Sequence, residues 1–260
     1  DQPRSRGLGD VYKRQDLAQA RRAMVRLCGV IERLGADPSF NGHAEVSISL
    51  AALGLKVSDD LARDHARQVC QVARDNHVAV TVDDEGPDIH DRSHRIVMDL
   101  LSEYENTGIV IQAARHDSLM QVRELAAPGR RIRLCKGSYT GPRSVTLIRP
   151  HDVDLRMAAC LRALMTGPST VMLASHDPVF VALGEQLMAS LDRQLEFQML
   201  QGIRPLEQRR LVDIGHRMRV YLPYGHDWYR YCTRRIVERP GNIWPVSYTH
   251  LRAHETEADL

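Results

Sequence analysis

The feature that most constrains the fold is a regular alternation between short apolar runs, rich in Val and Ile, and longer amphipathic stretches. The apolar runs lie at Glu45–Leu50, Val78–Val82, Gly108–Ile111, Arg131–Cys135, Thr170–Leu173, Gln194–Met199 and Met218–Leu222. The amphipathic stretches predict helices, among them Asp59–Asp75, Ser93–Asn106, Asp154–Met165, Pro178–Leu191 and Pro205–Arg217. Most runs are nearly continuously apolar, as in a parallel sheet covered on both faces. Strand–helix units of roughly 25–40 residues predict an α/β fold, either an open doubly wound sheet or a barrel.

The residues at the strand ends favour the barrel. Each predicted strand finishes in polar or aromatic residues, which are Ser49, Asp83–Glu85, Gln112 with Arg115, Lys136 with Gly137, Ser175–Asp177, Gln198 with Gln201, and Tyr221 with Tyr224. In a (β/α)8 barrel, functional groups at the C-terminal ends of many strands share one mouth. An open sheet gathers them at one or two switch points, and no Gly-x-Gly-x-x-Gly fingerprint follows any strand. We therefore predict a (β/α)8 TIM-like barrel.

Only seven strands are predicted, so the barrel is expected to lack its first strand. That strand should precede a helix predicted at Asp16–Leu34, but residues 1–15 contain no apolar run and no starting Met. Residues 1–15 and 245–260 both resemble translated sequencing-adapter read-through, and we treat them as a non-native leader and tail. The predicted domain is one barrel over residues 16–244, with a gap between the strands at Glu45–Leu50 and Met218–Leu222.

Composition excludes several classes of protein. The chain has 260 residues and a net charge of +2, without the basic bias of a nucleic-acid binder. Its five cysteines are scattered and form no Cys-x-x-Cys motif, which favours a reducing compartment and disfavours a disulfide framework or a zinc ribbon. No apolar run is long enough to span a bilayer, and no secretory signal is visible. We expect a cytoplasmic protein without a transmembrane segment and without a nucleic-acid partner.

A pair of arginines near the C-terminus could bind a small anion. Arg234 and Arg235 lie in a predicted helix just after the last strand, and Glu238 follows on the same helical face. Two guanidinium groups steered by a carboxylate suit a bidentate clamp for a substrate carboxylate. From this segment alone, a solvated basic helix face is an equally good interpretation.

Seven segments, in this order along the chain, resemble the proline dehydrogenase (proline oxidase) family. The segments are VSISLAALG at Val46–Gly54, TVDDE at Thr81–Glu85, GIVIQA at Gly108–Ala113, RLCKGSY at Arg133–Tyr139, ASHD at Ala174–Asp177, EFQMLQGIR at Glu196–Arg204, and RVYLPYG…WYRYCTRR…E at Arg219–Glu238. Each segment is weak alone, but their order makes the set specific. The resemblance covers about Asp16 to Trp244.

The resemblance implies an FAD enzyme with a (β/α)8 barrel, either alone or as the first module of a bifunctional proline-catabolic protein. Such an enzyme oxidises L-proline to Δ1-pyrroline-5-carboxylate by hydride transfer to FAD, and passes the electrons to a membrane quinone. It implies a pyrroline-5-carboxylate dehydrogenase module or protein as the downstream partner. Peripheral association with the inner membrane surface is compatible with such a cytoplasmic enzyme.

The family pattern assigns two catalytic residues. Arg133 matches the arginine beside flavin N5, where a fixed positive charge favours the anionic reduced flavin. An arginine within an apolar run is costly unless it is paired, which supports a functional role over a surface arginine. Asp83 matches an acidic residue at the base of the active site, and a buried carboxylate there needs a cationic or hydrogen-bonding partner.

Other residues match substrate-binding and flavin-binding positions. Arg234 and Arg235 match the carboxylate clamp, with Glu238 as its supporting acid. Tyr221 and Leu200 match side chains over the proline ring, and Tyr139 belongs to the polar network of Asp83; ordinary packing at a barrel mouth would explain Tyr221 and Leu200 as well. The matches to the flavin site are Asp84, Gln112, Arg133, Cys135, Lys136, Gly137, Ser175, His176 and Gln198.

One departure from the family concerns Ser49, because the family normally has a lysine there, near the substrate carboxylate. Serine can donate a hydrogen bond but brings no charge, and a charged contact is worth roughly 1.5–3 kcal/mol against about 1 for a neutral one. The alternative function is therefore a non-catalytic or degenerate flavin-binding barrel fragment. A metal-dependent barrel hydrolase would need His/Asp pairs on several strand ends, and only Asp83 and His176 qualify, so no metal site is predicted.

Overall fold

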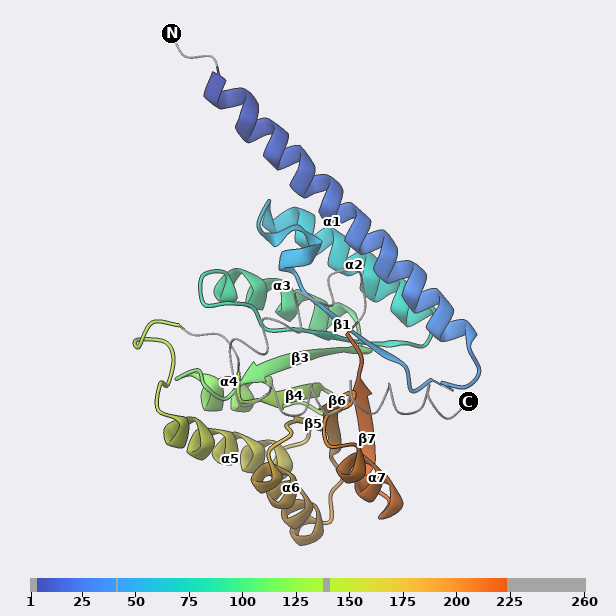
Figure 1. Ribbon diagram of the computed structural model, residues 1–260, viewed down its shortest axis with the longest axis vertical. Helices are drawn as coiled ribbons and strands as arrows, with labels where there is room; N and C mark the ends of the chain where they lie inside the picture. Colours follow the sequence, from blue (N-terminus) through green and yellow to red (C-terminus); the bar gives the residue numbers. More distant parts are fainter. Residues whose placement is uncertain (1–3, 41, 138–140, 224–260) are drawn as a thin grey trace, which may run out of the picture.

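The computed structural model describes residues 4–40, 42–137 and 141–223 (Figure 1). The strands are β1 (Glu45–Ile48), β2 (Ala79–Val82), β3 (Thr107–Gln112), β4 (Arg131–Cys135), β5 (Thr170–Ala174), β6 (Glu196–Leu200) and β7 (Arg217–Tyr221). The helices are α1 (Arg4–Ala36), α2 (Asp59–Asp75), α3 (His90–Glu103), α4 (Ser118–Leu125), α5 (Pro150–Thr166), α6 (Pro178–Leu191) and α7 (Pro205–Asp213), with a short π-helix, η1 (Ala51–Leu55). Strands and helices alternate from β1 onward, as the sequence predicts.

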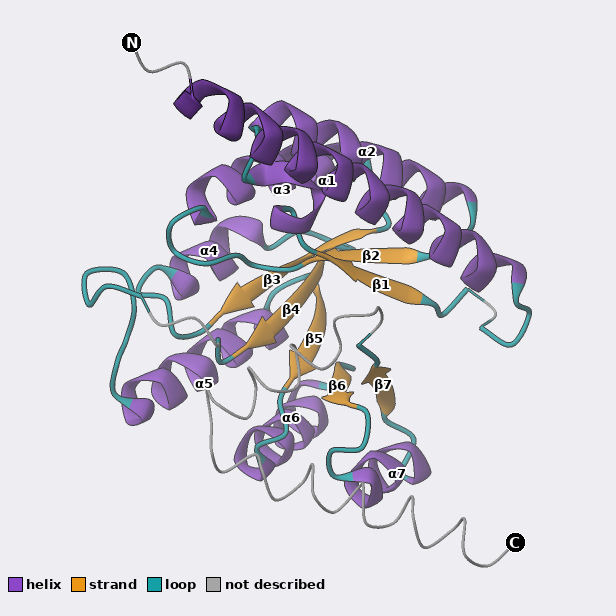
Figure 2. Cartoon of the chain, turned by 45° about the horizontal axis from the view of Figure 1, so that its top comes forward, coloured by secondary structure: helices purple, strands orange, loops and turns teal. Residues whose placement is uncertain are grey.

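The strands form one parallel sheet in the order β1-β2-β3-β4-β5-β6-β7. Every neighbouring pair is parallel, with Ser47 opposite Thr81 at one side of the sheet and Leu200 opposite Tyr221 at the other. Figure 2 shows the strands turning progressively from β1 to β7, so that the sheet curls into an open barrel. Within the described residues, β1 and β7 are the edge strands and have no backbone pairing with each other. The predicted barrel and the predicted gap between these two strands are confirmed.

The two faces of the sheet differ sharply, which corrects the expectation of strands that are apolar on both faces. Side chains alternate along a strand, and the outward positions belong to the apolar core beneath the helices; they include Ile48, Val80, Val82, Ile109, Ile111, Ile132, Leu134, Val171, Leu173 and Phe197. Many inward positions are polar or charged, as Arg131 and Arg133 on β4 illustrate, although Val110 and Met172 also face inward. Runs that look continuously apolar therefore alternate between an apolar outer face and a polar interior.

Helix α2 shows how the sequence builds the outer layer. Ser58 caps it by accepting a hydrogen bond from the backbone N–H of Leu61, and two aspartates occupy the first turn, where negative charge is favourable. Its buried residues recur every three or four positions and face the sheet; they are Ala62, Ala66, Val69, Cys70 and Ala73. Helix α1 packs across α2 on the far side from the strands (Figure 1).

Two helices differ from the sequence-based prediction. Helix α1 begins at Arg4 rather than near Asp16, and no proline interrupts it as far as Ala36. Residues 4–15 thus contain helix and, as predicted, no strand; their non-native origin stays a prediction, and the tail lies outside the described residues. Helix α4 was not predicted, because its eight residues are too few to show a clear period.

Candidate active site

Asp83, which directly follows β2, and Arg133, in the middle of β4, lie together inside the barrel. Arg133 is only 6% exposed, and its Nη1 lies 3.2 Å from Oδ1 of Asp83 and 2.5 Å from the hydroxyl of Ser47. Burial raises the pKa of the Asp83 carboxyl to about 6, while Arg133 acts in the opposite direction. The carboxylate keeps 38% of its surface accessible, so it lies in protein surroundings but faces the mouth. The predicted pairing of this acid with a cation is thus present.

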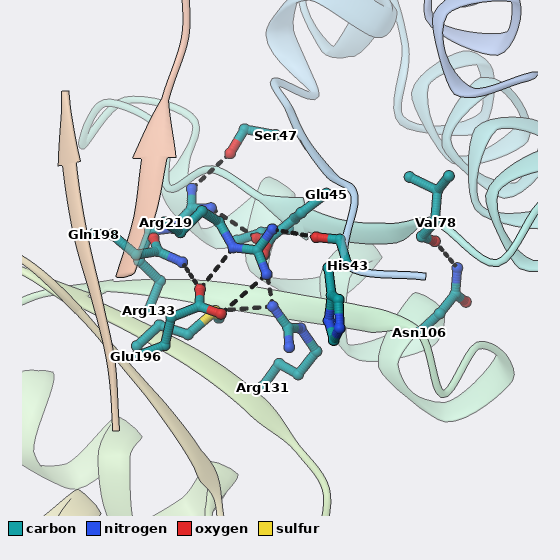
Figure 3. Close-up of polar contacts among 12 residues, drawn as sticks. His43, Glu45, Ser47, Val78, Asn106, Arg131, Arg133, Glu196, Gln198 and Arg219 are labelled. Carbon is teal, nitrogen blue, oxygen red and sulfur yellow. Dashed lines mark hydrogen bonds and ion pairs between the residues drawn. The ribbon is translucent and has the colours of Figure 1, made fainter. Parts of the chain in front are cut away.

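A layer of charged side chains lies beneath this pair inside the barrel (Figure 3). Glu45 accepts hydrogen bonds from Arg133 at 2.8 Å and from Arg131 at 2.6 Å. Arg219 on β7 donates to both oxygens of Glu196, at 2.7 and 2.9 Å. The guanidinium groups of Arg131, Arg133 and Arg219 face the carboxylates of Glu45 and Glu196 in the layer, and Asp83 above it supplies a third carboxylate to Arg133.

The aromatic ring of Tyr221 lies above Arg133, with Cζ of the guanidinium group 5.8 Å from the ring centroid. Leu200 ends β6 and pairs with Tyr221 of β7 in the sheet. Both side chains are half-buried. The two residues predicted to pack over the substrate ring therefore lie side by side at the mouth.

A buried chain of polar groups holds the predicted flavin residue Gln112. Its amide nitrogen donates to Oδ2 of Asp84 at 3.0 Å, while Nδ1 of His90 lies 2.7 Å from the other Asp84 oxygen. The side chains of Asp84 and His90 are each only 6% exposed. Asp84 thus acts in this structure by orienting Gln112, since its two oxygens are already bound within the protein.

Gly137 leaves room beside Gln112. Its φ of +99° is favourable only for glycine, and an added Cβ would lie 2.6 Å from Oε1 of Gln112. Any side chain at position 137 would therefore collide with the amide. Contact with Gln112 thus requires glycine here, and the close approach of the backbone to a cofactor stays a prediction.

Cys135 ends β4 and Lys136 follows it, and their side chains have different surroundings. The ammonium group of Lys136 lies 2.6 Å from Asp154 and 2.8 Å from Asp177, over the ring of Phe180. Because these partners belong to α5 and to the start of α6, the lysine charge is held toward the outer helices. Burial raises the pKa of the Cys135 thiol to about 12, which disfavours the thiolate form.

The three predicted flavin residues of β5 and β6 make contacts within the protein. The hydroxyl of Ser175 accepts from the backbone N–H of Asp177 at 3.2 Å, and Nε2 of His176 accepts from that of Leu200 at 2.9 Å. Gln198 donates to Oε1 of Glu196 at 2.6 Å, two residues before β6 ends. Gln198 therefore belongs to the charged layer below the mouth and not to the strand end, where it was predicted.

Ser49 follows β1 and binds Glu85. Its hydroxyl donates to Oε1 of Glu85 at 2.8 Å, and the same oxygen accepts from the backbone N–H of Ala51 at 2.9 Å. Glu85 is only 7% exposed, so a buried carboxylate lies beside the position where the family has a lysine. The remaining predicted substrate residues, Tyr139, Arg234, Arg235 and Glu238, lie outside the described residues.

Sequence reasoning missed the residues that support the pair of Asp83 and Arg133. They are Glu45, Arg131, Glu196, Arg219, Glu85 and His90. A signal was present for most of them, because charged or polar residues stand at alternate positions in EVS, RIR, EFQ and RMR. In a barrel these positions share the inner face, where they can pair with one another.

The site at the mouth and the curled parallel sheet define the chain as an α/β enzyme-type barrel of the TIM-like class. A family model described as Proline dehydrogenase matches residues 11–243. Proline dehydrogenase 1 of Bacillus subtilis (strain 168) is 36% identical over 203 residues, covering 77% of this chain and 67% of that protein. Proline dehydrogenase of Deinococcus radiodurans is 31% identical over 228 residues, covering 82% of this chain and 71% of that protein.

Solved structures agree on the fold. Proline utilization A from Bdellovibrio bacteriovorus, in a crystal form inactivated by N-propargylglycine, superimposes with a TM-score of 0.75 at 22% identity. The match covers 85% of this chain but only 28% of that much longer protein. The chain belongs to the proline dehydrogenase family.

Proposed function

We propose that the protein oxidises L-proline to Δ1-pyrroline-5-carboxylate, with FAD as the hydride acceptor and a quinone as the final electron acceptor. The observation that carries this proposal is the buried guanidinium group of Arg133 at the mouth, between Asp83 and the ring of Tyr221. Membership of the proline dehydrogenase family supports proline as the substrate. The downstream step would be carried out by a pyrroline-5-carboxylate dehydrogenase module or protein.

The residues at the mouth fit FAD. Gly137 provides a position where any side chain would meet Gln112, which suits a cofactor approached by the backbone. Among the described residues, Nε of Arg133 is buried without a hydrogen-bond partner, although the other two guanidinium nitrogens bind Glu45, Asp83 and Ser47. We infer that Arg133, Gln112 and Gly137 would hold the flavin ring, which on reduction becomes more negative. The chemistry that FAD supplies when bound is acceptance of a hydride from the ring carbon next to the proline nitrogen.

The chain's own residues bind and orient the substrate. Tyr221 and Leu200 lie side by side and would pack against the apolar ring of proline. Asp83 keeps its accessible carboxylate toward the mouth, so it can influence the charge of groups that enter. The carboxylate of proline would be bound by Arg234 and Arg235, which Glu238 supports, while Tyr139 and Ser49 complete the pocket.

The predicted flavin contacts are supported to different degrees. Asp84 would act through Gln112, and the main chain of Lys136 remains at the strand end, where its carbonyl accepts from Ala114. Cys135, Ser175, His176 and Gln198 stay proposals as flavin neighbours. None of the described helices has both the length and the apolar composition needed to cross a bilayer. Electrons would therefore reach a membrane quinone through association at the membrane surface.

The visible absorbance spectrum of the purified protein tests the proposal. We expect flavin bands that bleach when L-proline is added without oxygen, and Δ1-pyrroline-5-carboxylate as the product. Flavin bands that persist with proline would favour the alternative, a non-catalytic flavin-binding barrel. A colourless protein that takes up no added FAD would contradict both readings.

A further inference from the structure

One buried carboxylate in the charged layer is shared by three arginines. The side chain of Glu45 is only 2% exposed. It lies 2.8 Å from Nη2 of Arg133, 2.6 Å from Nη2 of Arg131 and 3.1 Å from Nε of Arg219, and it also accepts a hydrogen bond from the hydroxyl of Thr81 (Figure 3). Glu45 of β1 is therefore a carboxylate that pairs with arginines of both β4 and β7.

The local sequence leaves space for this convergence. Gly108 on β3 lies opposite Arg131 in the sheet, and an added Cβ would be 2.9 Å from the Cβ of Arg131. The same Cβ would be 3.2 Å from the hydroxyl of Thr81, which binds Glu45. A residue with a side chain at position 108 would push apart the groups that surround the carboxylate.

We propose that Glu45 is a positioning residue for the redox site: its carboxylate holds the guanidinium group of Arg133 beneath the mouth and joins it to β1 and β7. This inference rests on the proposed function, because it concerns the residue assigned to the flavin. A buried guanidinium group with two carboxylate partners on different strands has little freedom to turn. Removing the deeper partner would leave a buried charge poorly compensated.

The other carboxylates near Arg133 cannot replace Glu45. Asp83 is 38% accessible at the mouth, whereas Glu45 is almost completely enclosed. Glu196 lies in the same layer but binds Arg219 and Gln198. Burial acts to raise the pKa of the Glu196 carboxyl, but the hydrogen bond and charge of Arg219, together with Gln198 and Arg131, keep this pKa below its usual range. Glu185 on α6 serves as the control glutamate, because it lies outside this layer and its two oxygens each bind Arg210 of α7 at 2.9 Å.

The same carboxylate bridges the edge strands. Arg219 of β7 donates from Nη1 to the carbonyl of His43 at 2.6 Å, just before β1, and its Nε contacts Glu45. Because β1 and β7 have no backbone pairing within the described residues, these side-chain contacts connect them. The position of Arg133 is therefore coupled to the contact between the two edges of the sheet.

A double-mutant cycle on the flavin-loaded full chain tests the proposal. The variants are Glu45→Gln, Arg133→Met, their combination and Glu185→Gln. Two quantities are measured: the rate constant of anaerobic flavin reduction at saturating L-proline, and the dissociation constant for FAD from titration of the apoprotein. In the wild-type background, we expect Glu45→Gln to slow flavin reduction about tenfold and to weaken FAD binding about tenfold. In the Arg133→Met background, the same substitution should change either quantity by less than about twofold. Glu185→Gln should change either quantity by less than about threefold.

The outcomes separate the inference from a structural role and from the proposed function. Equal effects of Glu45→Gln in both backgrounds would mean that Glu45 acts independently of Arg133, and would overturn the inference. A wild-type protein that binds FAD but is not bleached by proline would overturn the proposed function, while the FAD titrations would still decide on Glu45. If Glu45→Gln does not fold, Glu45→Asp enters the same cycle, since it keeps the charge but shortens the reach. Its effect should again disappear with Arg133→Met, and a persistent effect would overturn the inference.

Discussion

The guanidinium group of Arg133 lies beneath the ring of Tyr221, with Cζ 5.8 Å from the ring centroid. The two residues come from β4 and β7, which are three strands apart in the sheet. Their contact across the interior is possible only because the sheet curls. A cation packed against an aromatic face is favourable by about 0.5–2 kcal/mol, and here the same cation also binds Asp83.

Arg133→Met should keep the barrel but slow flavin reduction by proline. Methionine has a similar length, but it removes the positive charge that would favour the reduced flavin. Loss of one preorganised group of this kind typically costs about 10²–10³ in rate. Stopped-flow measurement of anaerobic flavin bleaching checks this, with circular dichroism to verify the fold. An unchanged reduction rate would remove Arg133 from the catalytic residues.

Asp83 should make the stability of the protein depend on pH. The pKa of its carboxyl is raised from 3.8 to about 6, so the folded state retains a proton that the unfolded state loses earlier. As pH rises from about 4 to about 6, the free energy of unfolding must therefore decrease by this contribution. Asn at this position cannot lose a proton. Relative to wild type, Asp83→Asn should gain stability across that interval, on the order of 1 kcal/mol after solvent screening of a half-exposed group.

Urea unfolding of wild type and Asp83→Asn at pH 4 and at pH 7 provides the measurement. The free energy of unfolding of Asp83→Asn minus that of wild type should be larger at pH 7 than at pH 4. A difference that does not change between the two pH values would show that Asp83 titrates near its ordinary pKa in the folded protein.

His90→Phe should weaken flavin binding without direct contact to the mouth. The imidazole holds one oxygen of Asp84, whose other oxygen orients the amide of Gln112. Without it, a carboxylate that is only 6% exposed would lose a partner and turn, and a lost hydrogen bond to a charged group costs roughly 1.5–3 kcal/mol. We expect the FAD dissociation constant to rise about tenfold.

His94→Phe is the matched control for this substitution. The ring of His94 stacks on that of His90 with a centroid distance of 5.8 Å. The His94→Phe variant therefore changes the same aromatic contact but keeps the bond between His90 and Asp84. Equal FAD affinities for the two variants would contradict the proposed role of His90.

The sequence predicts the strands of this fold closely because the outer face of each strand is apolar. The predicted strand Arg131–Cys135 and the predicted helices Asp59–Asp75 and Pro178–Leu191 agree with β4, α2 and α6 to the residue. Where the pattern is short, as in Ser118–Leu125, the helix was not predicted. Helix α1 also begins earlier than predicted, since no apolar period marks residues 4–15.

The site was predictable only in part, for a physical reason. Asp83 and Gln112 stand at strand ends, where a barrel gathers its functional groups, whereas Arg133 stands in the middle of β4 and was assigned through the family resemblance. Glu45 and Glu196 stand at strand starts, and their role depends on which side chains of distant strands meet inside the barrel. Lys136 illustrates the same limit, because only the packing of α5 and α6 decides that its ammonium group binds Asp154 and Asp177.

Replacing either clamp arginine should weaken proline binding. Arg234→Met and Arg235→Met each remove charge-assisted hydrogen bonds to the substrate carboxylate, which corresponds to about a 10- to 100-fold rise in the dissociation constant for proline. Proline titrations followed by flavin absorbance measure this. FAD affinity serves as the internal control and should stay within about threefold of wild type. A variant that binds proline normally would show that the arginine belongs to a solvated helix face.

Ser49→Lys should strengthen proline binding. The buried carboxylate of Glu85 already binds the Ser49 hydroxyl at 2.8 Å, so it is placed to pair with a new ammonium group and to offset the cost of burying it. The added charge would favour the proline carboxylate, and a charge-assisted contact corresponds to about a tenfold gain in affinity. Ser49→Met is the matched control, because it adds a side chain of similar reach without charge and should give no gain. Proline titrations of the two variants provide the measurement. Equal affinities would mean that side-chain length rather than charge matters at this position. A loss of affinity in Ser49→Lys would mean that the new ammonium group pairs with Glu85 and does not favour the proline carboxylate.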